Sequence, residues 1–150
     1  PRDVMNGSLN VKRTYLQWSI ASEMECTKNS KILKLTRNVD VSHLLKPSFV
    51  ENLQLGVNYK KFISLNVLNE LLSCPPNLLV GEAILFQDFG IVRKPYIINL
   101  WKCKDGRVSA AWTLPITNRK EIGILYHEIG FPLAEKNKKV SKILSSYVRI

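Results

Sequence analysis

The chain has 150 residues, of which 45% are hydrophobic and 23% are charged, and its formal net charge is +10 at pH 7. These values are typical of an ordinary soluble globular protein, and the length suffices for one domain with a substantial core. No apolar run approaches the roughly 20 residues of a membrane span, and the first five residues contain no apolar signal-peptide core.

The charge and the cysteines narrow the choice of partner and compartment. A strongly basic chain favours an anionic partner such as nucleic acid, an anionic membrane or an acidic protein surface. The basic residues are scattered in short pairs, so a solvated surface also explains them. Cys26, Cys74 and Cys103 are widely spaced and form no Cys-x-x-Cys pair. This pattern favours reduced thiols in a cytosolic or nuclear protein over a disulfide framework or a zinc site.

The first half of the chain predicts strands joined by polar segments. Residues 8–20 alternate loosely between apolar and polar positions and predict a strand with a break near Arg13. Residues 23–30 predict a polar loop, and residues 31–35 predict a short strand. Residues 39–45 fit either the end of a strand or a single helical turn.

Residues 64–73 predict the first helix. Leucines recur there at helical spacing, Ser64 is a suitable N-cap, and two prolines after residue 74 end the pattern. Beyond them, residues 80–86, 96–103 and 108–114 predict three successive strands, because apolar and β-branched residues are concentrated there.

The last two of these strands are joined by Lys104-Asp105-Gly106-Arg107. Asp-Gly between two apolar runs is a strong signal of a type I′ hairpin, in which both central residues have positive φ. The resulting register pairs Trp101 with Ala110, Cys103 with Val108, and Asn99 with Trp112. We therefore expect Trp101 and Trp112 to share one apolar face.

The C-terminal part predicts a linker and a helix. Residues 115–120 are expected to form the linker, whereas residues 122–129 are apolar but interrupted by glycine, so their state is open. Residues 135–147 carry an apolar stripe at helical spacing with lysines mostly off it. This amphipathic helix either docks on the sheet or receives a partner.

Together these elements predict a single, mainly β domain of the α+β class. We expect an antiparallel sheet or a small β-barrel with one internal helix and one C-terminal amphipathic helix. Residues 1–118 would form a strand-rich partner-binding domain. Residues 119–150 would form a helical extension that packs on that domain or on a partner.

The sequence contains no recognisable catalytic group of residues. His43 and His127 are its two histidines, and neither belongs to a nucleophile–base pair or a zinc-binding motif. The acidic residues are few and dispersed, and no glycine-rich phosphate loop is present. We therefore expect no enzymatic activity, no cofactor and no metal site.

Two segments place aromatic residues beside basic ones, Tyr59-Lys60-Lys61-Phe62 and Arg93-Lys94-Pro95-Tyr96. Such side chains can stack on nucleic-acid bases and bind the backbone phosphates. In a strand, however, Phe62 and Tyr96 would more often be directed into the core. A basic nucleic-acid-binding domain is therefore the alternative function.

The remaining function is an interaction module. Residues 86–92 place large apolar side chains around an expected turn, and loops are usually polar. The partner could add a strand at an open edge or lay an apolar helix into a groove. The alternative is that these side chains plug the core or form a second core layer beneath a helix. The predicted contact residues are Phe86, Phe89, Ile91, Tyr96, Ile98 and Leu100, the last three on the hairpin face opposite Trp101 and Trp112.

Several short motifs follow one another in an order that is informative. They are Gly7-Ser8-Leu9 with Leu16-Gln17-Trp18, residues 38–44, Gly56-Val57-Asn58-Tyr59, residues 80–86, and Lys94-Pro95-Tyr96-Ile97-Ile98. Over residues 7–114, their order and spacing resemble the N-terminal domain of the Sld-seven family of budding-yeast DNA replication-initiation proteins. Residues 115–150 do not match that family well.

The resemblance implies a non-enzymatic nuclear subunit. Its domain would bind the N-terminal region of a larger origin-firing subunit, Sld-three, and would help to recruit the helicase activator to replication origins. The resemblance implies no catalytic residue, no membrane contact and no small-molecule substrate. A weak contact of the basic surface with nucleic acid remains compatible with it.

Overall fold

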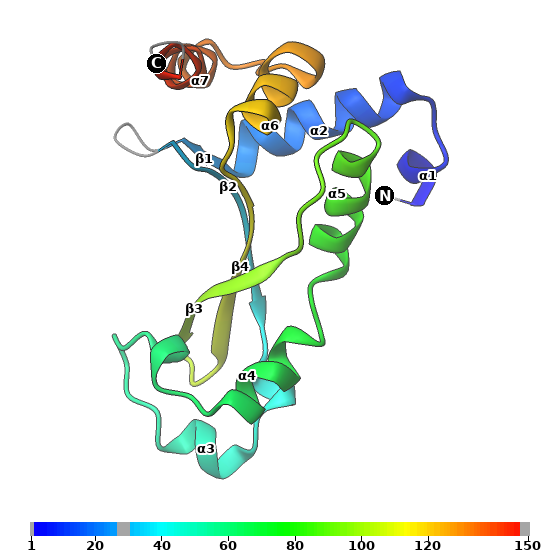
Figure 1. Cartoon of the computed structure of the whole chain (residues 1–150). Helices are drawn as coiled ribbons and strands as arrows, with labels where there is room; N and C mark the ends of the chain where they lie inside the picture. Colours follow the sequence, from blue (N-terminus) through cyan, green and yellow to red (C-terminus); the bar gives the residue numbers. More distant parts are fainter. Residues whose placement is uncertain (1, 27–30, 148–150) are drawn as a thin grey trace.

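The computed structural model describes residues 2–26 and 31–147 and has one α+β domain with an open antiparallel sheet (Figure 1). The strands are β1 (Met24–Cys26), β2 (Leu33–Asp40), β3 (Tyr96–Lys102) and β4 (Val108–Ile116), in the order β1-β2-β4-β3. The α-helices are α1 (Arg2–Met5), α2 (Leu9–Glu23), α3 (Pro47–Glu51), α4 (Leu65–Leu72), α5 (Asn77–Gln87), α6 (Arg119–Ile124) and α7 (Ala134–Ser146). Two 3-10 turns, η1 (Ser42–Leu44) and η2 (Tyr59–Lys61), and a π-helical segment, η3 (Leu125–Ile129), complete the elements.

The single domain and the antiparallel sheet confirm part of the predicted fold. The small barrel is wrong because β1 and β3 remain the two edges of an open sheet. The mainly β composition and the single internal helix are also wrong, since α2 and α5 occupy segments predicted as strands. No helix among the described residues is both long enough and apolar enough to cross a membrane.

Helix α2 replaces the strand predicted over residues 8–20. The side-chain oxygen of Ser8 accepts a hydrogen bond from the backbone N–H of Val11 and caps the first turn. Leu16 and Ile20 lie one turn apart and are fully buried against the sheet. At the other end, the Lys136 ammonium donates to the carbonyl oxygens of Ile20 and Ala21. This contact stabilises the helix, because it places a positive charge at the negative end of the helix dipole.

Helix α5 replaces the strand predicted over residues 80–86. It begins directly after Pro76, and Leu79, Ala83 and Phe86 follow one another at helical spacing and are buried. Figure 1 shows α5 beside the sheet, next to α2. Because α5 is apolar on more than one side, its sequence shows no amphipathic period that would separate it from a buried strand.

The β3–β4 hairpin is confirmed, but its turn and its register differ from the prediction. Gly106 has φ of 88°, whereas no non-glycine residue of the described chain has positive φ, so the turn is not type I′. The Cys103 N–H donates to the Arg107 carbonyl at 2.7 Å, which encloses a three-residue loop with glycine in the left-handed position.

The longer loop moves the register by one residue. Leu100 pairs with Ala110 and Trp101 pairs with Ser109, and a β-bulge follows between Ile97 and Asn99. Because a shift of one residue exchanges the two faces of a strand, Leu100 lies on the same face as Trp112. The prediction that Trp101 and Trp112 share a face is therefore wrong.

Other predicted segments are placed as follows. The helix predicted over residues 64–73 is confirmed as α4, capped by Ser64, and the C-terminal amphipathic helix is confirmed as α7. The short strand predicted over residues 31–35 is the first part of β2, which runs from Leu33 to Asp40 and is followed by η1, so both alternatives for residues 39–45 occur. The predicted loop over residues 23–30 contains β1, and residues 27–30 lie outside the described part. The linker predicted over residues 115–120 contains the last residues of β4 and the first residues of α6. Residues 122–129, whose state was left open, are helical.

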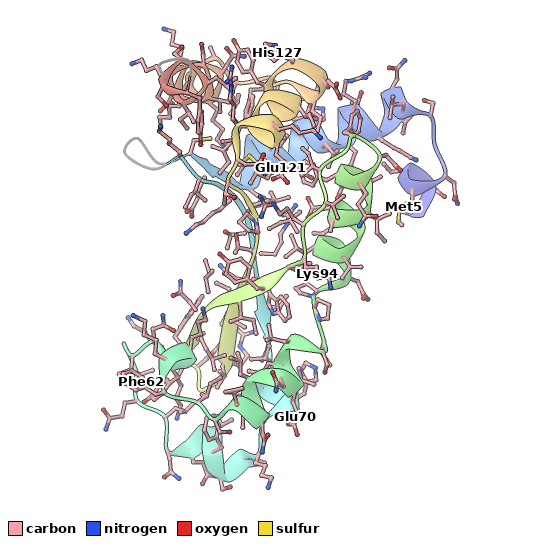
Figure 2. All side chains as sticks on the ribbon, viewed as in Figure 1. Met5, Phe62, Glu70, Lys94, Glu121 and His127 are labelled. Atoms are coloured by element: carbon pink, nitrogen blue, oxygen red, sulfur yellow. The ribbon has the colours of Figure 1, made fainter. Side chains whose placement is uncertain are left out.

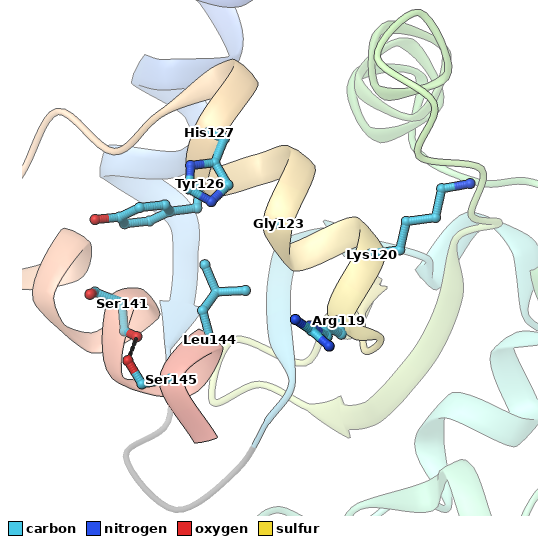
Figure 3. A pocket seen from close by; sticks show the side chains of 8 residues that line it. All are labelled: Arg119, Lys120, Gly123, Tyr126, His127, Ser141, Leu144 and Ser145. Atoms are coloured by element: carbon cyan, nitrogen blue, oxygen red, sulfur yellow. Dashed lines mark hydrogen bonds between the residues drawn. The ribbon is translucent and has the colours of Figure 1, made fainter. Parts of the chain in front are cut away.

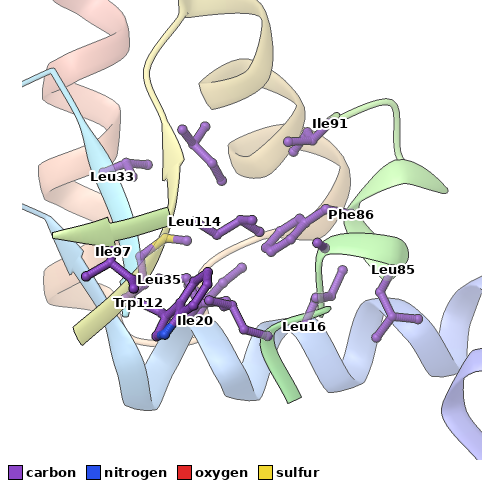
Figure 4. Packing of buried hydrophobic residues seen from close by; sticks show 14 of the residues in the cluster. Leu16, Ile20, Leu33, Leu35, Leu85, Phe86, Ile91, Ile97, Trp112 and Leu114 are labelled. Atoms are coloured by element: carbon purple, nitrogen blue, oxygen red, sulfur yellow. The ribbon is translucent and has the colours of Figure 1, made fainter. Parts of the chain in front are cut away.

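One hydrophobic core joins the sheet to the helices (Figure 4). Figure 4 shows Leu16 and Ile20 of α2 and Phe86 of α5 packed over Leu114 and Trp112 of β4. The described part of the predicted C-terminal extension packs on this domain, because its apolar residues join the same cluster. These residues are Ile122, Leu125, Ile129, Phe131, Val140 and Ile143.

Two ion pairs with buried carboxylates link elements that are distant in sequence. The Arg37 guanidinium on β2 donates to both carboxylate oxygens of Glu82 on α5, at 3.0 and 2.9 Å. Burial by itself lowers the pKa of Arg37, but the hydrogen bonds and charge of Glu82 outweigh it and raise the pKa above its ordinary value. Likewise, Arg93 binds the Glu121 carboxylate at 2.8 Å and connects the segment before β3 to α6.

Candidate interaction surfaces

The six residues predicted to bind a partner do not form one surface. Phe86, Phe89, Ile91 and Leu100 are buried in the core. Phe86 is buried because its segment is a helix, and Leu100 because of the shifted hairpin register. Tyr96, with 38% of its surface exposed, and the half-buried Ile98 are the two that a partner can reach in this structure.

The two basic–aromatic segments meet on the outer side of β3. The Lys60 ammonium of η2 lies 5.8 Å from the centre of the Tyr96 ring, in cation–π geometry. Phe62 is 74% exposed, so the expectation that Phe62 and Tyr96 are directed inward is wrong for both side chains. Figure 2 shows Phe62 at the periphery of the molecule, away from the sheet.

The same region closes part of the β3 edge. The Asn58 side-chain oxygen accepts a hydrogen bond from the Leu100 N–H at 3.0 Å, and its amide nitrogen donates to Asn99 at 2.7 Å. Leu55 forms an isolated bridge with Lys102. These contacts occupy positions at which an added strand would pair, so the C-terminal half of β3 is a poor docking edge.

Helix α2 carries a second apolar stripe on the side away from Leu16 and Ile20, in which Val11 and Trp18 are exposed and Tyr15 is half-buried against the core. Val11, Tyr15 and Trp18 follow at i, i+4 and i+7 and therefore share a face. Trp18 is 66% exposed. Beside them, a groove of about 420 Å³ is lined by Val4 of α1 and by Asn10, Val11, Thr14 and Tyr15 of α2. The three apolar residues Val11, Tyr15 and Trp18 are called the α2 stripe below.

A larger groove lies between the α6–η3 segment and α7 (Figure 3). Its volume is about 720 Å³. One wall carries Arg119, Lys120, Gly123, Tyr126 and His127, and the other carries Ser141, Leu144 and Ser145 of α7. Figure 3 shows the Tyr126 ring directed toward α7 and the Lys120 side chain directed away from it. This α6–α7 groove is basic and was not anticipated from the sequence, because its two walls lie about 20 residues apart.

The described residues include three free thiols and no cluster of potential metal ligands. No three His, Cys, Asp or Glu side chains there are close enough to hold a metal ion. Cys26, Cys74 and Cys103 are free thiols, and burial raises the pKa of Cys26 although Lys136 and Lys139 act in the opposite direction. A buried thiol with a raised pKa is a weak nucleophile.

Comparisons of this chain with protein-family models, curated proteins and solved structures find no match.

Proposed function

We propose that the chain is a non-enzymatic protein–protein interaction module, and that the α2 stripe receives an apolar segment of a larger subunit. The observation that carries this proposal is Trp18, a tryptophan left 66% exposed in a domain that buries Trp112. Tryptophan is enriched among the residues that dominate the binding energy of protein interfaces. An i, i+4, i+7 apolar stripe beside a groove suits a helical or extended apolar segment.

The charged residues near the stripe support this role because they are engaged within the domain. Lys12 pairs with Asp88 of the α5 C-cap at 2.8 Å. Arg13 donates to the Glu128 carbonyl oxygen at 2.7 Å and also binds Asn10. A partner that covers Val11, Tyr15 and Trp18 would therefore not have to desolvate a free cation from this part of α2.

The resemblance to the Sld-seven family names the first partner to test. Trp18 belongs to the Leu16-Gln17-Trp18 motif on which that resemblance partly rests. On this basis we propose that the module acts in the nucleus in an origin-firing complex. It would bind the N-terminal region of the larger Sld-three-type subunit and support recruitment of the helicase activator.

Calorimetric titration of the chain with that N-terminal fragment tests both parts of the proposal. We expect binding in the wild type and at least about tenfold weaker binding in Trp18→Ala, since a central interface tryptophan contributes roughly 2 kcal/mol or more. Val92→Ala is the matched control, because Val92 is an exposed apolar residue (68%) outside the stripe, and should bind as the wild type does.

The outcomes separate partner from surface. No binding of the fragment at micromolar concentration would refute the origin-firing assignment. Unchanged affinity of Trp18→Ala would refute the α2 stripe as the binding surface. A loss confined to Tyr96→Ala would place the partner on the hairpin surface instead.

A further inference from the structure

We propose that the α6–α7 groove binds single-stranded nucleic acid through its phosphates and one stacked base. This inference goes beyond the protein-binding function, because the groove shares no lining residue with the α2 stripe. It rests on the charge, the shape and the side-chain chemistry of the groove.

The groove is positively charged and little neutralised. The Arg119 and Lys120 side chains form no ion pair or hydrogen bond with other described residues, and both residues are exposed. On α7, Lys138 and Lys142 lie three residues before Ser141 and Ser145, on the same side of the helix. Arg119 in the groove and Lys138 and Lys142 beside its α7 wall are therefore available to phosphates, whereas the Lys120 side chain is directed away from α7 and adds only to the local charge (Figure 3). Neutralisation of phosphates releases counterions and supplies most of non-specific nucleic-acid affinity.

The nearby carboxylates offset little of this charge. Residues 119–147 contain Glu121, Glu128 and Glu135. Glu121 is bound to Arg93, and Glu135 pairs with Lys139 at 3.3 Å. Glu128 is exposed and is the carboxylate of this segment without an ion pair in the described chain. The local balance around the groove therefore stays positive.

The shape of the groove favours a single strand over a duplex. Reading a duplex requires a protein element that protrudes into a DNA groove, whereas this site is concave. A Cβ added at Gly123 would meet no atom within 4 Å, so the α6 wall is open at the middle of the groove. An unpaired nucleotide can enter such a hollow and stack on the exposed part of the Tyr126 ring, which is half-buried against the core and in edge contact with His127. The Ser141 hydroxyl is available for a hydrogen bond, whereas the Ser145 hydroxyl donates to the Ser141 carbonyl oxygen at 2.9 Å and can only accept.

The test is a fluorescence anisotropy titration with a labelled oligothymidylate of about 12 nucleotides at two salt concentrations. We expect salt-sensitive binding by the wild type. Arg119→Glu should weaken it at least about tenfold, and Tyr126→Ala should weaken it about tenfold through loss of one stacked base. Gly123→Leu should also weaken binding, because it fills the groove without changing the charge.

The matched control is Lys61→Glu, in the distant η2 turn. It lowers the net charge from +10 by the same two units as Arg119→Glu, and Lys61 is exposed. We expect less than about a threefold effect, since only long-range attraction is lost. Trp18→Ala should bind the oligonucleotide normally, which separates this site from the proposed protein-binding surface. Circular dichroism and thermal unfolding establish which variants are folded, and the comparison uses those.

Three results would overturn the proposal. The first is an equal loss of affinity in Arg119→Glu and Lys61→Glu, which would mean diffuse surface attraction. The second is tighter binding of a duplex of the same length. The third is binding of a polyglutamate peptide as tight as that of the oligonucleotide, which would indicate an acidic protein as the ligand.

Discussion

Removal of the Arg37 side chain should destabilise the domain strongly, because it leaves a buried carboxylate unpaired. The Glu82 side chain is 0% exposed, and Arg37 supplies two hydrogen bonds of 3.0 and 2.9 Å to its oxygens. Removal of one partner of a buried ion pair lowers the free energy of unfolding by about 3–5 kcal/mol. The Arg37 side chain is 17% exposed, and its guanidinium also lies 3.5 Å from the Glu23 carboxylate. We therefore expect the lower end of that range, about 3 kcal/mol, for Arg37→Met.

The measurement is urea unfolding followed by tryptophan fluorescence, with linear extrapolation of the free energy of unfolding to water. A loss of about 3 kcal/mol is a large fraction of the 5–15 kcal/mol that is typical of small domains. The matched variant is Arg37→Met/Glu82→Leu, which removes both charges together. It should be within about 1.5 kcal/mol of the wild type, because no charge is left buried without a partner.

The double-mutant cycle decides whether this reasoning holds. Strong coupling between positions 37 and 82 would appear as a double variant that is more stable than Arg37→Met alone. The reasoning is refuted if Arg37→Met unfolds with a free energy within about 1 kcal/mol of the wild type. It is equally refuted if the losses of the two single variants simply add in the double variant.

Three further predictions concern the hairpin and the cysteines. Gly106→Ala should lower the free energy of unfolding by about 1 kcal/mol, because φ of 88° is unfavourable for an L-residue; equal urea midpoints would contradict this. Cys74, which is exposed, should react with a thiol reagent before Cys26, whose pKa is raised by burial. Mass spectrometry of partially labelled protein gives the order of labelling, and earlier labelling of Cys26 would contradict the prediction. The Arg107 backbone N–H and guanidinium lower the pKa of Asp105 below its ordinary 3.8. Asp105 therefore binds its proton less readily in the folded state than in the unfolded state. Its ionised carboxylate stabilises the folded state above pH 3.8, and this stabilisation is lost as the pH falls below 3.8. Asp105→Asn should have a shallower loss of stability between neutral pH and about pH 3, and an unchanged pH profile would argue against the effect.

Local sequence signals predicted those elements whose ends are marked chemically. Ser64 and the following leucines identified α4, and the apolar stripe with its lysines identified α7. The Asp105-Gly106 pair located the hairpin but not its turn type. Because two- and three-residue loops share this signal, the register could not be decided from the turn residues alone.

The two wrong strands have different physical causes. In α2, core residues and solvent-facing apolar residues both occur, and their combined pattern imitates the alternation of a strand. The Ser8 cap was a usable signal for the helix that the strand prediction did not use. In α5, burial on several sides removes the amphipathic period, so the apolar run by itself could not be distinguished from a buried strand.

The candidate surfaces depended on these assignments. With α2 assigned as a helix, the spacing of Val11, Tyr15 and Trp18 already indicates a shared face. The exposure of that face does not follow from spacing, since the opposite side with Leu16 and Ile20 is also apolar. The α6–α7 groove requires Tyr126 and Ser141 to be brought together across an intervening turn, which no local pattern encodes.

The sequence by itself determined the α+β class, the antiparallel hairpin, the helices α4 and α7 and the strongly basic charge. These properties follow from composition, from turn and capping residues, and from periodicity within one element. Tertiary structure alone decided which apolar side chains are core and which face solvent, because burial depends on what packs against each face. It therefore placed Phe86 and Leu100 inside and left Trp18 outside, which moved the proposed contact surface from the hairpin to α2.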